Sequence, residues 1–127
     1  AGIEETGRFA RSDRNVRYAT QSGPLLVEGG RLHPALLPDG ASRHIRNGVG
    51  IGPDGEVVLV ISETRVSLGA FARLFRDELD CRDALYLDGS VSALADADGL
   101  RSGRNTPAGP VIRVERNPVR QDVSHVD

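Results

Sequence analysis

The sequence contains no lysine, methionine or tryptophan, and it has a single cysteine, Cys81. A lone cysteine cannot close a disulfide within the chain or supply the paired Cys/His ligands of a structural zinc site. All 16 cationic side chains are arginine, and 18 acidic side chains give a net charge of −2. We expect no nucleic-acid partner, because binding to a phosphate backbone draws on a clustered basic surplus.

Long apolar runs are also absent. The longest nearly apolar run covers residues 57–61, which is far too short to span a bilayer, and no signal-peptide pattern opens the chain. We therefore expect no transmembrane segment. The lack of methionine indicates that the original N-terminus has been removed or that the chain is a piece of a longer protein. An export signal would have been upstream, so its absence does not favour the cytoplasm.

The length and composition of the chain predict a single folded domain. The chain has 127 residues, of which 39% are apolar and 27% charged, so it is long enough to bury a real core. Residues 1–14 read as a short helix or an irregular lead-in, and residues 16–20 as strand-like. Residues 25–28 and 31–33 flank a Gly-Gly pair, which predicts a tight hairpin followed by a loop with two prolines.

The middle of the chain predicts a second hairpin and one helix. Residues 43–51 are extended and reach a Pro-Asp-Gly turn, after which residues 56–62 are rich in β-branched side chains. We expect this last segment to be a central strand covered on both faces. Residues 67–79 carry apolar side chains at spacings of three and four, which predicts a helix with Ser67 as its N-cap.

The last third predicts a buried strand at residues 83–88, a short helix at 91–97, a loop at 99–109 and a final strand at 110–116. We expect the tail beyond these segments to be frayed. The fold class that follows is α/β (α+β): a twisted mixed or antiparallel sheet with one main helix packed on it.

Three clusters combine polar residues with glycine near strand ends, where rigid scaffolds present reactive side chains. A glycine beside a polar residue either satisfies a turn or lets a ligand approach the backbone, and for one cluster alone the turn is favoured. The clusters are Gln21-Ser22-Gly23-Pro24, Arg46-Asn47-Gly48-Val49-Gly50 and Asp88-Gly89-Ser90-Val91-Ser92.

Asp88 follows the apolar run 84–87, and a carboxylate that closes a buried strand needs a partner or a shifted pKa. Arg46 is the expected partner, although an ordinary Asp-Gly turn explains Asp88 equally well. Cys81 has no base beside it and is expected to be a small buried hydrophobe.

The sequence contains no pattern typical of a metal site, a bound cofactor or a serine hydrolase. The three histidines lack further ligands at suitable spacing and are expected to be solvated, so we assign no metal. There is no Gly-x-Ser-x-Gly elbow, Walker loop or dinucleotide fingerprint, and we assign no cofactor. The histidines are His33, His44 and His125.

Taken together and in order, the three clusters resemble the phosphodiester glycosidase family, most closely a bacterial exported branch. The matching text is ATQSGPLLVEGGRLHP, SRHIRNGVGIGPDGEVVLVIS and FARLFRDELDCRDALYLDGSVSAL, within residues 18–94. The resemblance implies a mixed α/β fold, hydrolysis of the glycosidic bond of a sugar-1-phosphodiester, and a periplasmic or secreted location. The expected partner is a sugar-phosphodiester small molecule or a glycan.

The chain departs from the family pattern in two places. Members commonly carry Asp-Gly-Gly where this chain has Asp-Gly-Ser at 88–90. The family domain also opens with an Asn-Gly-Gly-Phe-like motif that residues 1–17 lack. The resemblance therefore predicts that residues 1–127 are either a single domain or the C-terminal part of a phosphodiester glycosidase domain. In the second case, a missing N-terminal segment or a second chain completes the site.

The chemistry of such a reaction suggests roles for these residues. Breaking the anomeric C–O bond builds positive charge on the sugar, which the carboxylate of Asp88 would stabilise, while Arg46 would hold the departing phosphate. The remaining candidates would bind substrate: Gln21, Ser22, Gly23, Asn47, Gly89 and Ser90. The alternative is a non-catalytic carbohydrate-binding or envelope-associated module on the same fold.

Overall fold

The computed structural model describes residues 1–36, 40–88, 91–103, 107 and 109–117. Its elements follow one another as α1 (Thr6–Arg11), β1 (Leu25–Glu28), β2 (Arg31–Leu32), β3 (Asn47–Ile51), β4 (Val57–Ile61), α2 (Leu68–Arg73), the π-helical turn η1 (Leu74–Glu78), β5 (Asp83–Asp88), β6 (Ala93–Asp96) and β7 (Gly99–Gly103).

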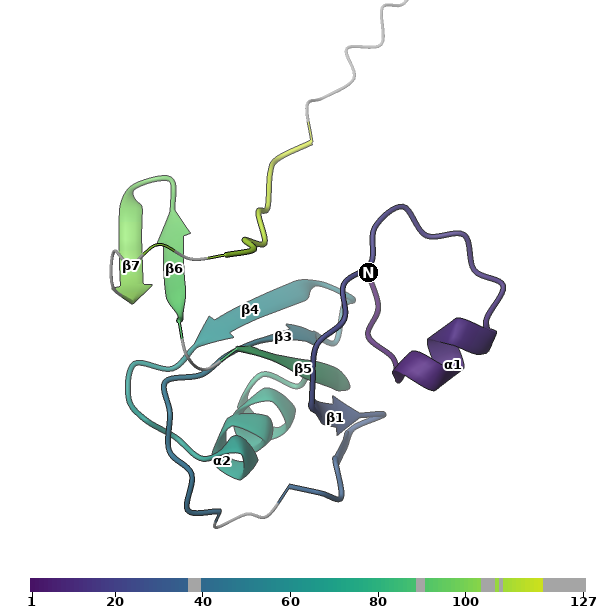
Figure 1. Cartoon of the computed structure of the whole chain (residues 1–127), viewed down its shortest axis with the longest axis horizontal. Helices are drawn as coiled ribbons and strands as arrows, with labels where there is room; N and C mark the ends of the chain where they lie inside the picture. Colours follow the sequence, from purple (N-terminus) through teal and green to yellow (C-terminus); the bar gives the residue numbers. More distant parts are fainter. Residues whose placement is uncertain (37–39, 89–90, 104–106, 108, 118–127) are drawn as a thin grey trace, which may run out of the picture.

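The strands β1 to β5 form one antiparallel sheet in the order β2-β1-β5-β3-β4, and β6 and β7 form a separate hairpin. The main helix α2 lies beside this sheet, whereas α1 and the hairpin β6–β7 lie outside it (Figure 1). The expected class, an antiparallel sheet with one main helix packed on it, is confirmed.

Glycines close both predicted hairpins of the sheet. Gly29 and Gly30 have φ angles of 57° and 79° between β1 and β2, and Gly55 has a φ of 81° between β3 and β4. Side chains other than glycine rarely adopt these angles, so the turns could be placed from the sequence. Of the two alternatives for residues 1–14, a short helix or an irregular lead-in, the structure has the helix, α1.

The prediction that residues 56–62 form a central strand is wrong. β4 lies at the edge of the sheet, and the central position belongs to β5. A run of β-branched residues shows that side chains pack on a pleated surface but does not count the neighbouring strands. Val58 and Val60 pack against the core, while Val57 is 48% exposed.

Three C-terminal assignments and one N-terminal assignment are also corrected. Residues 91–97 were expected to be a helix but contain β6, and residues 99–103 of the expected loop form β7. The two strands pair with each other, and this pairing outweighs the weak local preference for helix. Residues 16–20 and 110–116 form no strand, because no ladder partner lies beside them.

The helix predicted from residue 67 begins where expected. The Ser67 hydroxyl accepts a hydrogen bond from the Ala70 N–H at 3.1 Å, which confirms the N-cap. After Arg73 the helix widens into η1, where the Leu79 N–H bonds the Leu74 carbonyl at 3.1 Å. Phe71 and Phe75 are both buried, with ring centroids 5.2 Å apart in an edge-to-face arrangement.

Two glycines of β3 allow these rings to lie on the strand itself. A Cβ at Gly50 would stand 2.7 Å from the Cys81 sulfur and 2.8 Å from Phe75 Cδ1. A Cβ at Gly48 would stand 3.0 Å from Phe71 Cε1. The Gly-Val-Gly-Ile-Gly run therefore serves helix–sheet packing at these two positions.

Replacing Phe75 by alanine should lower the free energy of unfolding by about 3–5 kcal/mol, because the ring is fully buried between helix and sheet. Urea denaturation of Phe75→Ala and the parent measures the loss. Tyr18→Ala is the control, since Tyr18 is 88% exposed and should change stability by less than about 0.5 kcal/mol. Equal stability of Phe75→Ala and the parent would contradict the packing.

Adding one methyl group at Gly50 should lower the free energy of unfolding by about 1–3 kcal/mol, because its Cβ overlaps Cys81 and Phe75. Thermal melts of Gly50→Ala measure the change. Gly109→Ala is the matched control, because nothing lies within 4 Å of a Cβ built there. A Gly50→Ala melt that coincides with the control would show that Phe75 can move aside without cost.

Candidate functional site at the carboxyl end of β5

The site is built around the carboxyl end of β5, because β5 is antiparallel to both of its neighbours. The residues that precede β1 and β3 therefore lie where β5 ends. This places parts of all three polar-glycine clusters in one region, although the clusters are 25 to 67 residues apart in the chain.

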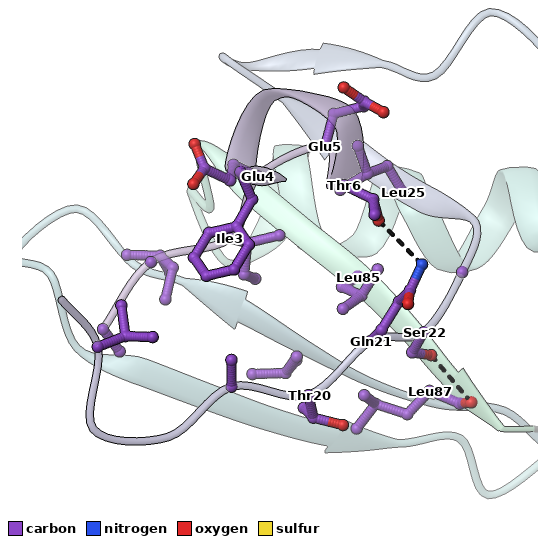
Figure 2. A pocket seen from close by; sticks show the side chains of 18 of the residues that line it. Ile3, Glu4, Glu5, Thr6, Thr20, Gln21, Ser22, Leu25, Leu85 and Leu87 are labelled. Carbon is purple, nitrogen blue, oxygen red and sulfur yellow. Dashed lines mark hydrogen bonds between the residues drawn. The ribbon is translucent and has the colours of Figure 1, made fainter. Parts of the chain in front are cut away.

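The first cluster binds the end of β5 through Ser22. The Ser22 hydroxyl donates to the Tyr86 carbonyl and lies 3.2 Å from the Leu87 carbonyl (Figure 2). The Gln21 amide nitrogen donates to the Thr6 hydroxyl at 3.1 Å, which joins this segment to α1. Gly23 follows and forms a cis peptide bond with Pro24.

The second cluster contributes Asn47, whose side chain bonds to both Asp88 and Ser92. Its side-chain oxygen accepts from the Asp88 N–H at 3.0 Å, and its amide nitrogen donates to the Ser92 hydroxyl at 2.7 Å. Asn47 and Asp88 are also paired in the ladder, next to a register shift. Asn47 thus fixes the backbone from which the Asp88 side chain projects.

Arg46 is 3% exposed, and its guanidinium is held mainly by backbone carbonyls. Nε donates to the Val66 carbonyl at 2.8 Å, and Nη2 lies 3.3 Å from the Ser42 carbonyl. The guanidinium carbon also lies 5.5 Å from the centre of the Tyr86 ring, a cation–π contact. These contacts, and not an ion pair with Asp88, position the guanidinium among the described residues.

Asp88 itself is exposed at the end of β5. The candidate residues that follow it, Gly89 and Ser90, lie outside the described residues. The end of β5 thus presents one exposed carboxylate, Asp88, and the residue just before the neighbouring strand β3 is the buried Arg46.

A cavity of about 800 Å³ opens on the sheet face opposite α2. Its floor is apolar and comes from β3 and β5, and its wall is the N-terminal segment, which we define as residues 1–24 (Figure 2). Glu4 lines it, bonded to Arg14 through one carboxylate oxygen, while the other oxygen is buried without a hydrogen-bond partner in the described structure. The candidates Gln21, Ser22 and Gly23 also line it.

Two side chains near these elements have shifted pKa values, and the structure shows the cause of each shift. Glu5 caps the start of α1, and hydrogen bonds from the Gly7 and Arg8 N–H groups lower the pKa of its carboxyl. Burial raises the pKa of the Cys81 thiol, which is 2% exposed behind Gly50. The expectation that Cys81 is a buried hydrophobe and no nucleophile fits this protonated, enclosed state.

The histidines have separate surroundings. His44 bridges to Val66 through its backbone, and the His33 ring nitrogen Nδ1 accepts from the Ala35 N–H at 3.2 Å. Within the described ranges no three His, Cys, Asp or Glu side chains gather as a metal site would need, and His125 lies outside those ranges.

Several contacts of the site could not be predicted from the sequence. Ser92 stands in the third cluster but had no assigned role, and it bonds Asn47. Tyr86 looked like one more apolar strand residue, yet its ring lies against Arg46. Ser42 lies only four residues before Arg46, but Val66 lies 20 residues after it, and only long-range packing brings the Val66 carbonyl to the guanidinium.

Comparison with known protein families matches a region that contains these residues. The sequence profile described as phosphodiester glycosidase matches residues 3–120, nearly the whole chain. The chain belongs to the phosphodiester glycosidase family. This confirms the resemblance that the three clusters suggested.

Among curated proteins, this phosphodiester glycosidase family member is similar to the uncharacterized protein YigE of Escherichia coli (strain K12). The two are 35% identical over 115 residues, which cover 91% of this chain and 45% of the E. coli protein. The chain thus spans less than half the length of that relative. No solved structure matches the chain. No helix in the described residues is long and apolar enough to cross a membrane.

The contact between Asn47 and Asp88 can be tested by hydrogen exchange. Asn47→Ala should speed exchange of the Asp88 amide, because the side-chain oxygen that accepts from it is removed. Ser92→Ala is the matched control, since it removes the other partner of Asn47 and leaves the Asp88 contact in place. Equal exchange rates in the two variants, followed by NMR, would contradict a positioning role for Asn47.

Proposed function

We propose that this chain forms the part of a phosphodiester glycosidase that cleaves the bond between a sugar's anomeric carbon and a phosphodiester oxygen. The observation that carries the proposal is the meeting of the three clusters at the carboxyl end of β5 in a member of this family. The product pair is a free sugar and a phosphomonoester. The reaction class is hydrolysis.

Asp88 is the proposed carboxylate of the reaction. Breaking the C–O bond gives the sugar oxocarbenium character, and a nearby carboxylate stabilises that charge as it develops. The departing phosphate is already a good leaving group, so a strong general acid matters less than for an ordinary glycoside. One positioned carboxylate with a cation for the phosphate is then sufficient.

Arg46 is the proposed cation for the phosphate. Its Nε and Nη2 are used by Val66 and Ser42, whereas Nη1 has no acceptor among the described residues. A guanidinium fixed in this way loses little freedom when an oxyanion binds, and its burial strengthens the attraction. A substrate phosphate would meet it at Nη1.

The sugar is proposed to lie against the first cluster and against residues 88–90. Gln21, Ser22 and Asn47 offer an amide or a hydroxyl to sugar hydroxyls, and backbone groups at Gly23, Gly89 and Ser90 would complete the contacts. Because the chain spans 45% of the E. coli relative, the activity is proposed for the longest natural polypeptide that contains it. We also propose an exported location, periplasmic or secreted.

Neutralising Asp88 should lower kcat with little effect on KM, because its charge matters mainly in the transition state. Arg46→Ala should impair both constants, since the phosphate is charged in the ground state as well. The assay is sugar release from a nucleotide sugar without added metal, using Asp88→Asn and Arg46→Ala. Glu63→Gln, an exposed carboxylate in the loop after β4, is the matched control and should behave as the parent.

Circular dichroism of each variant shows whether a loss of activity comes from the missing side chain or from unfolding, which matters for the buried Arg46. Unchanged turnover in Asp88→Asn would remove the proposed role of that carboxylate. If the parent binds sugar phosphodiesters but turns over none of a panel of them, the protein is a carbohydrate-binding module and not a glycosidase.

A further inference from the structure

The strand β4 has one side that bonds to β3 and one side that bonds to nothing among the described residues. The Gly52 N–H bonds the Glu56 carbonyl, and the Ser62 N–H bonds the Arg46 carbonyl. In an antiparallel ladder such hydrogen-bonded pairs alternate with non-bonded pairs. The residues between them, Val57, Leu59 and Ile61, therefore direct their N–H and C=O groups away from β3.

This free edge lacks the usual protection. Natural edge strands carry charges, prolines or bulges that prevent another strand from pairing with them. The five residues of β4 read Val-Val-Leu-Val-Ile, and their pairing with β3 is regular along its whole length. The edge is thus an open template for a further strand.

The sheet face below this edge is also incompletely covered. On the face toward α2, Gly48, Gly50 and Ala84 are buried, whereas every strand residue that we place on the opposite face of β3 and β5 is only half-buried. The N-terminal segment does not close this face, because the cavity of about 800 Å³ separates them and α1 buries none of its residues. The half-buried residues are Val49, Ile51, Leu85 and Leu87.

The free edge and the uncovered face point to the same occupant. Val57 and Leu59 lie opposite Ile51 and Val49 in the ladder, so their side chains share the uncovered face. A strand added beside β4 would satisfy the free backbone groups and lay its own apolar side chains next to Val57, over the cavity. The matching partner is an extended segment with apolar residues at alternate positions.

We propose that β4 pairs with an extended strand from a polypeptide region outside this chain, equivalent to the part of the E. coli relative that the match does not cover. That relative is more than twice as long as the matched region, so it contains enough further chain to supply the strand. A strand there would also border the cavity lined by Gln21 and Ser22. The proposal concerns assembly and does not depend on the proposed reaction.

The test uses the intact 127-residue chain and synthetic peptides. Overlapping peptides of about 20 residues, covering the E. coli sequence outside the match, are titrated against the chain by fluorescence anisotropy. One contiguous stretch is expected to bind and to slow hydrogen exchange about tenfold or more at the amides of Val57, Leu59 and Ile61. Exchange at Val58 and Val60, already bonded to β3, should change less.

Leu59→Pro is the decisive variant, because it removes a free-edge N–H without removing a bond to β3. It should weaken peptide binding about tenfold or more, while Leu59→Val, which keeps the N–H, should bind like the parent. If Leu59→Pro fails to fold by circular dichroism, Leu59→Lys replaces it, since a charge on this face blocks an apolar strand.

Three results would overturn the proposal. The first is that no peptide binds at millimolar concentration. The second is that a peptide binds equally well to the parent and to the blocked variant. The third is that the chain without peptide forms a concentration-dependent dimer by light scattering and protects the same three amides, in which case a second copy occupies the edge.

Discussion

The rings of Phe71 and Phe75 rest on the backbone of β3 at Gly48 and Gly50, and the rest of the structure depends on this close contact. It brings the helix near enough to bury Cys81 and Ala84 in the same cluster. The same strand β3 pairs with β5, whose end carries Asp88. Without a side chain at these two glycines, the strands meet the helix at a distance that a Cβ would prevent.

The same contact makes the two faces of the sheet unequal. The face toward α2 is packed, and Arg46 enters it just before β3, where its guanidinium contacts the Tyr86 ring and two backbone carbonyls. The opposite face is open, with a cavity bounded by the N-terminal segment. The candidate residues are divided accordingly: Gln21 and Ser22 border the cavity, Arg46 lies on the packed side, and Asp88 stands at the strand end between them.

Antiparallel order explains why the clusters meet. A strand whose two neighbours both run against it has their starting residues at its own carboxyl end. Ser22 and Asn47 use that position to bond the last residues of β5 from either side. Local sequence could indicate that each cluster stands near a strand end, but the meeting of the three depends on the strand order. The sequence predicted the class of the sheet and not this order, and it wrongly placed residues 56–62 at the centre.

The sequence by itself determined the local features: the glycine turns with positive φ, the Ser67 cap, the amphipathic helix and, through three motifs in order, the family. These depend on neighbouring residues, which the sequence lists directly. Tertiary structure alone decided that β4 is an edge and β5 the centre, and that the Val66 carbonyl holds Arg46. Those outcomes come from contacts between distant segments, where burial and ladder hydrogen bonds outweigh local preference.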